Sequence, residues 1–266
     1  MTKTTNRILH AAAACICAAA LSAPGSAQMA NTPKRDLTGI WAPLRTNEGI
    51  GGNGPLSARA DGKHEPPYTE AGMAAFKKNH PSNGTTEVGP GEENDPGHSC
   101  DPLGFPRADL FELRTEQIMQ NKDQVVILYQ YDRLWRSIWT DGRQISADAD
   151  PRWFGYSTGK WTDDYTFVVT TVNMDDRTWL DNAGRPHSDE LKVTEIFHRT
   201  APDLMELSVI IDDPKYYSKP WPGIDKIEMK LQPTNTDSIE MMCVPSELNA
   251  YNVKHANLGN GITGKK

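Results

Sequence analysis

Cysteine, basic charge and long apolar runs are all scarce in this chain of 266 residues. Of the four cysteines, Cys15 and Cys17 lie close to the N-terminus. Lysine and arginine total 28 against 35 acidic residues, giving a formal charge of −7. This balance argues against a nucleic-acid partner, which needs clustered basic charge. Glycine (21) and proline (19) are present at ordinary levels, which excludes collagen and a fully disordered chain.

The N-terminal segment 1–27 has the pattern of a secretory signal peptide. Lys3 and Arg7 precede a short apolar run at 8–21, and small residues lead up to Ala27. The run is too short to span a bilayer, which takes about 20 helical residues. We therefore predict cleavage near Ala27, a periplasmic or secreted protein, and no membrane anchor.

Removal of that segment leaves two cysteines, Cys100 and Cys243. In an oxidising compartment a lone pair most simply forms a disulfide. The alternative is a metal site that includes His98 and Cys100. A closed zinc site needs four ligands, and the sequence has no second tight pair of Cys and His. We predict the disulfide and no metal.

One domain is expected over residues 37–255, because all-β barrels of this size are common. A flexible leader at 28–36 would precede it, and a disordered tail at 256–266 would follow. Residues 45–66 and 80–107 are rich in Gly, Pro and Asn, which predicts long ordered loops near the start of the domain.

Between these loops, Thr69–Asn79 is the only clear helix, with Thr69 as its N-cap. From Leu110 onward the apolar period changes to two, which is typical of half-buried strands. The candidate strands are 37–41, 110–119, 124–131, 134–140, 154–161, 165–172, 190–199, 204–211, 225–232 and 238–243.

Most connections between these strands are short and carry turn residues, so neighbouring strands are expected to be antiparallel. About nine or ten short strands with almost no helix predict an all-β fold. The expected architecture is an up-and-down barrel that is closed or nearly closed.

The alternation also predicts which side chains point inward. In 204–211 the inward set is Met205, Leu207, Val209 and Ile211. In 225–232 it is Ile227, Met229 and Leu231, with Lys226, Glu228 and Lys230 on the other face.

Glu195 breaks the pattern of strand 190–199, because it falls on the same face as Val193 and Phe197. A carboxylate turned toward the interior must be paired, protonated or hydrated. Its expected partner is Arg136, which alternates with apolar residues on strand 134–140. Two interpretations stay open: a structural buried ion pair, or a polar group that lines a ligand cavity.

Aromatic side chains on strands 124–131 and 134–140 favour a barrel with a lined cavity over a fully packed barrel. Tyr129 and Tyr131 share a face of strand 124–131, and Trp135 and Trp139 share a face of the following strand. The alternative is that they belong to an ordinary core, or to an outer face covered by the loops.

Four segments resemble known proteins: 36–41 (DLTGIW), 155–161 (GYSTGKW), 179–189 (WLDNAGRPHSD) and 212–221 (DDPKYYSKPW). The first resembles the Gly-x-Trp strand of lipocalin-like (calycin) barrels. Together they resemble a large group of secreted bacterial proteins, mostly without an assigned activity. The resemblance implies a barrel and export, and it transfers no catalytic residue.

Ser157 lies in a Gly-x-Ser-x-Gly pattern, with Asp181 and His187 following in the order of α/β-hydrolases. A nucleophile elbow requires a strand, a sharp turn and a helix. Here the pattern runs directly into another strand, so we do not assign Ser157 as a nucleophile.

The loop 175–189 is the best candidate for a site, because it is dense in ionisable groups and joins two barrel strands. His187 is the candidate proton-transfer group, oriented by Asp181. A solvent-facing loop whose Asp residues cap turns is the alternative. Adjacent acids at Asp175 and Asp176 lack the ligand spacing of a known calcium loop.

We therefore expect a barrel that encloses a small apolar or aromatic ligand and acts on it by acid–base chemistry without a cofactor, as an isomerase, lyase, cyclase or hydrolase. A non-catalytic carrier of a hydrophobic molecule is the alternative, and a packed structural barrel is a third. The predicted ligand-binding residues are Arg136, Glu195, Tyr131, Tyr156, Trp161, Trp179, Tyr216 and Trp221.

Overall fold

The computed structural model describes residues 29, 31–44, 63, 65–89, 91–111, 113–146, 148–239, 241–251 and 253–254. The predicted signal peptide and C-terminal tail lie outside the described residues, as does most of the predicted loop 45–66.

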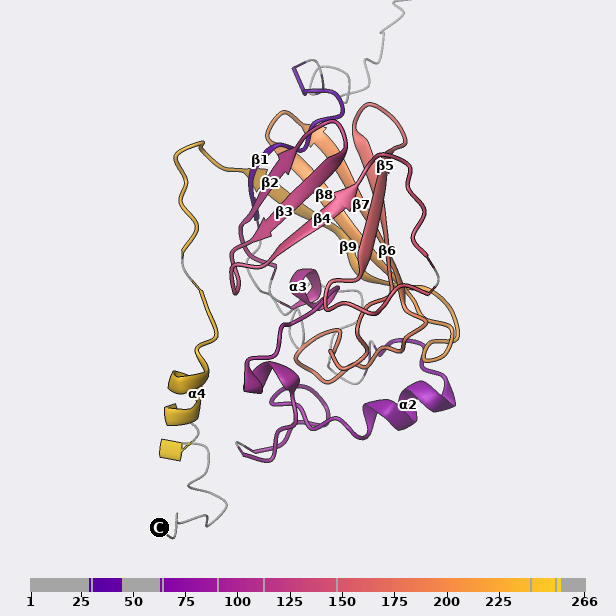
Figure 1. Ribbon diagram of the computed structural model, residues 1–266, viewed down its shortest axis with the longest axis vertical. Helices are drawn as coiled ribbons and strands as arrows, with labels where there is room; N and C mark the ends of the chain where they lie inside the picture. The colour runs from indigo at the N-terminus through magenta and orange to yellow at the C-terminus, as the bar shows by residue number, and fades with distance from the viewer. Residues whose placement is uncertain are drawn as a thin grey trace, which may run out of the picture.

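Nine β-strands form a closed barrel in which each strand pairs with the next along the chain and the last pairs with the first (Figure 1). This confirms the predicted all-β fold class. The strands are β1 (Gly39–Pro43), β2 (Glu116–Gln120), β3 (Gln124–Tyr129), β4 (Trp135–Trp139), β5 (Tyr156–Trp161), β6 (Thr166–Val172), β7 (Lys192–Ala201), β8 (Leu204–Asp212) and β9 (Trp221–Leu231).

The pairing between β4 and β5 departs from the expected antiparallel arrangement. These two strands are parallel and paired only at Ile138–Ser157 and Trp139–Thr158, whereas all other neighbouring pairs are antiparallel. Parallel neighbours cannot be joined by a hairpin, so the connection over 140–155 must return to the opposite end of the barrel. The short pairing makes this a weakly bonded seam in the barrel wall.

The predicted inward faces of β7 and β8 are confirmed. On β8 the residues Met205, Leu207, Val209 and Ile211 are completely buried. On β9 the alternation also holds, with Ile227 and Met229 buried and Leu231 half-buried. Burial of these side chains is the main stabilisation of the barrel.

The predicted strand 110–119 begins too early, and the predicted strand 238–243 is wrong. Residues Arg107–Leu110 form the short helix α3 below the barrel, and β2 begins only at Glu116 (Figure 1). Leu110 is the last residue of this helix and is buried. Its apolar side chain therefore packs under the barrel and does not belong to a strand. The described residues 238–239 and 241–243 form no strand, and among them only Met241 makes a single bridge, to Tyr131.

The predicted helix is confirmed as α2 (Glu70–Phe76), where Gly72 N–H donates to Thr69 Oγ1 at 3.0 Å. The structure adds a 3₁₀ turn η1 (Pro96–Ser99) and the helix α4 (Pro245–Tyr251). None of the described helices is long and apolar enough to cross a membrane.

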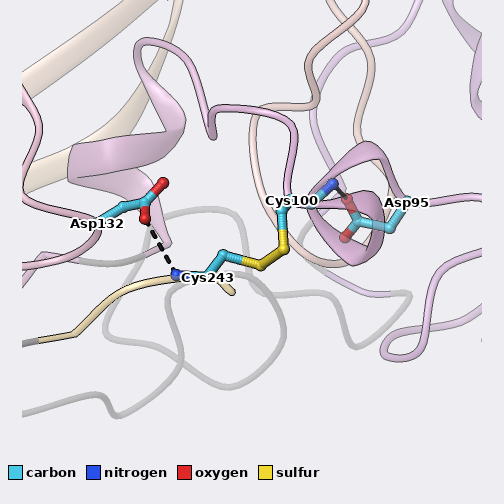
Figure 2. Close-up of a disulfide and its surroundings, with 5 residues drawn as sticks. Asp95, Cys100, Asp132 and Cys243 are labelled. Atoms are coloured by element: carbon cyan, nitrogen blue, oxygen red, sulfur yellow. Dashed lines mark hydrogen bonds between the residues drawn. A yellow bond between two sulfur atoms is a disulfide. The ribbon is translucent and has the colours of Figure 1, made fainter. Parts of the chain in front are cut away.

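The predicted disulfide between Cys100 and Cys243 is confirmed, with a Cα–Cα distance of 5.5 Å. It joins the chain just after η1 to the segment beyond β9 (Figure 2). Asp132 Oδ1 accepts a hydrogen bond from Cys243 N–H at 3.1 Å. The C-terminal segment is thereby tied to the loops below the barrel.

Candidate functional site

The predicted pairing of Arg136 with Glu195 is present inside the barrel. Arg136 Nη1 and Nη2 donate to Glu195 Oε2 and Oε1 at 2.8 and 2.6 Å. The two residues are only 3% and 0% exposed. The guanidinium also lies 3.9 Å from the centre of the Phe105 ring. A bidentate pair this deeply buried has a defined geometry, held by β4 on one side and β7 on the other.

Two further carboxyl groups lie buried in the same neighbourhood, Asp109 on α3 and Glu116 on β2. Their carboxyl oxygens make no hydrogen bond of good geometry among the described residues, nor does the hydroxyl of Tyr129 on β3, although Asp109 interacts at close range with Tyr129 and Glu195. Three buried acids therefore surround one arginine. We call Asp109, Glu116, Tyr129, Arg136 and Glu195 the inner acid cluster.

The environment of this cluster favours the protonated forms of Asp109 and Glu116. Burial raises the pKa of Asp109 to about 8, the charge of Glu195 adds to the rise, and Arg136 opposes it. Burial, followed by the charge of Asp109, holds the pKa of Glu116 well above its ordinary value. Burial also raises the pKa of the Tyr129 hydroxyl. At neutral pH Asp109 is therefore mostly protonated, and the pH is close to its pKa.

A cleft of about 770 Å³ lies outside the β4–β5 seam. Its lining combines five aromatic side chains with four arginines, and Arg136 and Ser157 of the barrel wall belong to it. We call it the aromatic–arginine cleft. It is lined by Trp135, Arg136, Ser137, Trp139, Arg143, Ile145, Pro151, Arg152, Trp153, Phe154, Gly155, Tyr156, Ser157, Asp175 and Arg177.

Arg136 links the two features. Its guanidinium is part of the inner acid cluster, and the same residue contributes to the wall of the cleft. The packed-barrel interpretation expected no cavity beside the Arg136–Glu195 pair. The cleft against Arg136 has the size of a ligand pocket, but it opens on the outer face of the barrel wall, where Trp135 is exposed, and not inside the barrel.

His187 is deeply buried at 2% exposure, and both of its ring nitrogens have partners. Nε2 lies 2.8 Å from Thr178 Oγ1, and Nδ1 lies 3.1 Å from the carbonyl oxygen of Ser188, to which it can donate. Burial lowers the pKa of His187. The histidine is therefore neutral at neutral pH and tied to its own loop.

Asp181 makes its contacts elsewhere in that loop. It accepts from Ala183 N–H at 2.9 Å, and Arg185 Nη1 donates to it at 2.9 Å. Asp181 and His187 do not form the hydrogen bond that was expected to orient the histidine. The two residues are close in sequence, but the turn at 181–185 directs the carboxylate to its own backbone and to Arg185.

The remaining predicted ligand-binding residues are dispersed. Tyr156 lines the cleft with Arg136, whereas Tyr131 is half-buried at its bridge to Met241. Trp161 packs on Phe167 with ring centres 5.1 Å apart. Outside the cleft lining, Trp179 and Trp221 are buried, and Tyr216 is half-buried.

Ser157 is the second residue of β5, and its hydroxyl is 2.9 Å from Thr171 Oγ1 on β6. The strand continues past it to Trp161 without the turn and helix of a nucleophile elbow.

Several groups that the structure brings together were not predicted from the sequence. Glu116 alternates with the inward Ile118, which is the same signal that identified Glu195. Asp109 gave no such signal, because its position depends on how α3 packs under the barrel. Arg152 and Trp153 lie in the connection between β4 and β5, where alternation predicts nothing.

The fold and site define a closed nine-stranded β-barrel with an aromatic–arginine cleft in its wall. No known family model, no curated protein and no solved structure matches the chain. Among the described residues, no group of three or more His, Cys, Asp or Glu side chains is placed to hold a metal ion.

Proposed function

We propose that the protein is an exported, lipocalin-like barrel that binds a small planar molecule in the aromatic–arginine cleft. The observation that carries this proposal is the cleft itself, with a volume of about 770 Å³ and five aromatic side chains. Ligand pockets commonly measure about 300–1,000 Å³ and are lined mainly by aromatic and apolar groups with a few polar ones. The disulfide supports export, because such bonds persist in oxidising compartments.

The arrangement of the cleft favours a flat ligand. Trp139 and Tyr156 come from the two strands of the seam, and Trp153 comes from the connection between them. Indole and phenol rings present flat apolar faces on which an aromatic ring can stack. The strands fix the backbone positions of Trp139 and Tyr156 beside the Arg136–Glu195 pair.

Acid–base catalysis on the bound molecule is a second candidate function. It is favoured by one observation, the buried carboxyl group of Asp109, which interacts with Arg136 and has a pKa of about 8. A carboxyl group whose pKa lies near neutrality is suited to proton transfer. Asp109 fits this role better than His187, whose ring nitrogens are both engaged.

The binding proposal is tested by native mass spectrometry of the full chain, expressed with its own leader and purified without detergent. We expect a co-purifying molecule of a few hundred daltons. Trp139→Leu should lose it, and Trp161→Leu should retain it, because Trp161 lies outside the cleft lining. Equal loss in both variants, or a wild-type chain that retains no ligand and binds no aromatic probe, would overturn the proposal.

The catalytic candidate is tested with the molecule so identified. If Asp109 transfers the proton, Asp109→Asn abolishes turnover and His187→Ala retains it. The reverse result would support the role first assigned to His187. If the molecule is recovered unchanged after incubation with the wild-type protein, the catalytic candidate is refuted and the protein is a non-catalytic carrier.

A further inference from the structure

The four arginines of the aromatic–arginine cleft differ in what neutralises them. Arg136 is committed to Glu195. Arg143 and Arg177 each donate to a nearby aspartate, Asp141 and Asp175, at 2.6 Å. For Arg152 the described residues offer no carboxylate within ion-pair distance. One positive charge in the lining therefore remains without an acidic partner.

The guanidinium of Arg152 is nevertheless positioned. Its Cζ lies 4.1 Å from the centre of the Tyr156 ring. The Tyr156 hydroxyl donates in turn to the carbonyl oxygen of Asp150 at 3.1 Å. Stacking occupies a face of the guanidinium and leaves its N–H edges available. Such an edge matches the two oxygens of a carboxylate.

Its arginine neighbours are stacked on aromatic rings and neutralised by their own acidic partners. Arg143 stacks on Trp139 at 3.5 Å and Arg177 on Trp153 at 4.4 Å. With three of the four lining arginines paired, Arg152 leaves the cleft with a net positive charge, although the whole chain is acidic at −7. A concave positive surface on an acidic protein attracts anions selectively.

We propose that the ligand of this cleft is a planar aromatic acid, whose ring packs against the stacked arginine and aromatic side chains of the wall and whose carboxylate pairs with Arg152. This inference rests on the proposed function and adds the charge and chemical class of the ligand. A guanidinium already stacked on Tyr156 loses little freedom when it takes up a carboxylate.

The test compares probes of the same shape that differ in charge. Isothermal titration measures the binding of 2-naphthoate, 2-naphthamide and 2-naphthalenesulfonate to the full chain. We expect wild-type protein to bind 2-naphthoate about tenfold or more tightly than the amide, as a charge-assisted pair provides. Added salt should reduce this preference, because Arg152 is exposed and its pair is screened.

Two variants locate the charge. Arg152→Gln should bind naphthoate and naphthamide equally. Arg35→Gln should keep the wild-type preference, since Arg35 is also an exposed arginine but pairs with Asp164 outside the cleft. A wild-type chain that binds the amide as tightly as the acid, or an Arg152→Gln variant that keeps the preference, would overturn the inference and leave the binding function standing.

Two other outcomes are informative. Tighter binding of the sulfonate than of the carboxylate would also overturn the inference, because it would identify a tetrahedral anion as the preferred group. Failure of all three probes to bind wild-type protein would overturn the proposed function and this inference with it.

Discussion

The side chain of Arg136 is held between Phe105 and Glu195, with its guanidinium 3.9 Å from the Phe105 ring centre and hydrogen-bonded to the carboxylate at 2.6 and 2.8 Å. Phe105 belongs to the loop below the barrel and Glu195 to the barrel wall. Arg136 thus connects the loop below the barrel to the barrel interior. The same residue also forms part of the cleft lining.

Replacing Glu195 with Ala should destabilise the protein, because it leaves a buried guanidinium without its main partner. We expect the free energy of unfolding to fall by about 3 kcal/mol, the lower end of the range for a broken buried pair. The lower end applies because Asp109 can ionise in place of Glu195. Urea denaturation measures this, with the exposed Glu228→Ala on β9 as the control. A loss within ~0.5 kcal/mol, as at an ordinary surface site, would contradict the prediction.

Asp109 makes stability depend on pH. Its pKa is about 8 in the folded protein and near 3.8 in the unfolded chain. Between these values the folded state binds the extra proton, so the contribution is fully present below about pH 4 and is lost as the pH rises to about 8. The slope is at most ~1.4 kcal/mol per pH unit. Asp109→Asn should flatten the profile of unfolding free energy, whereas Asp225→Asn on the exposed face of β9 should not. An unchanged slope in Asp109→Asn would show that another group is responsible.

His187 gives the opposite dependence. Burial lowers its folded pKa below 6.5, so the unfolded chain takes up the proton first and stability falls as the pH drops below about 6.5. His187→Ala should remove this acid-sensitive component and, through the lost hydrogen bonds and packing, lower stability by about 2 kcal/mol at pH 7. Thermal unfolding from pH 5 to 8 tests this, with the exposed His80→Ala as the control. Retention of the acid-sensitive component in His187→Ala would refute the assignment.

The Cys100–Cys243 disulfide closes a loop with a sequence separation of 143 residues. On the chain-entropy account its reduction should destabilise the protein by as much as ~5 kcal/mol. We expect a lower midpoint of thermal unfolding for the Cys100→Ser, Cys243→Ser double variant. A midpoint that matches that of the oxidised wild type would show that the loops below the barrel stay in place without the bond.

The parts of the fold that the sequence predicted are those governed by local alternation. The inward residues of β8 and β9 and the buried position of Glu195 follow from the period of two, since each strand has one face toward the core. Thr69 marked the start of α2 by the capping chemistry of its own side chain. These signals depend on neighbours along the chain, so no tertiary information is needed to find them.

Most of the candidate site could not be predicted from the sequence, because its residues are brought together by tertiary packing and not by neighbours along the chain. Parallel pairing of β4 with β5 depends on the path of the connection 140–155, and that path carries no period. Asp109 reaches the barrel interior only because α3 packs beneath it. His187 and Asp181 look like a pair in the sequence, but their partners are set by the turn between them.

Because β4 and β5 run in the same direction, the chain between them must travel the length of the barrel, and this crossing segment supplies Arg143, Arg152 and Trp153 to the cleft. The packing of the barrel strands places few constraints on the sequence of this crossing segment. Substitutions there can change which molecule is bound while the barrel keeps its stability, so specificity and folding are free to diverge separately in the evolution of this protein.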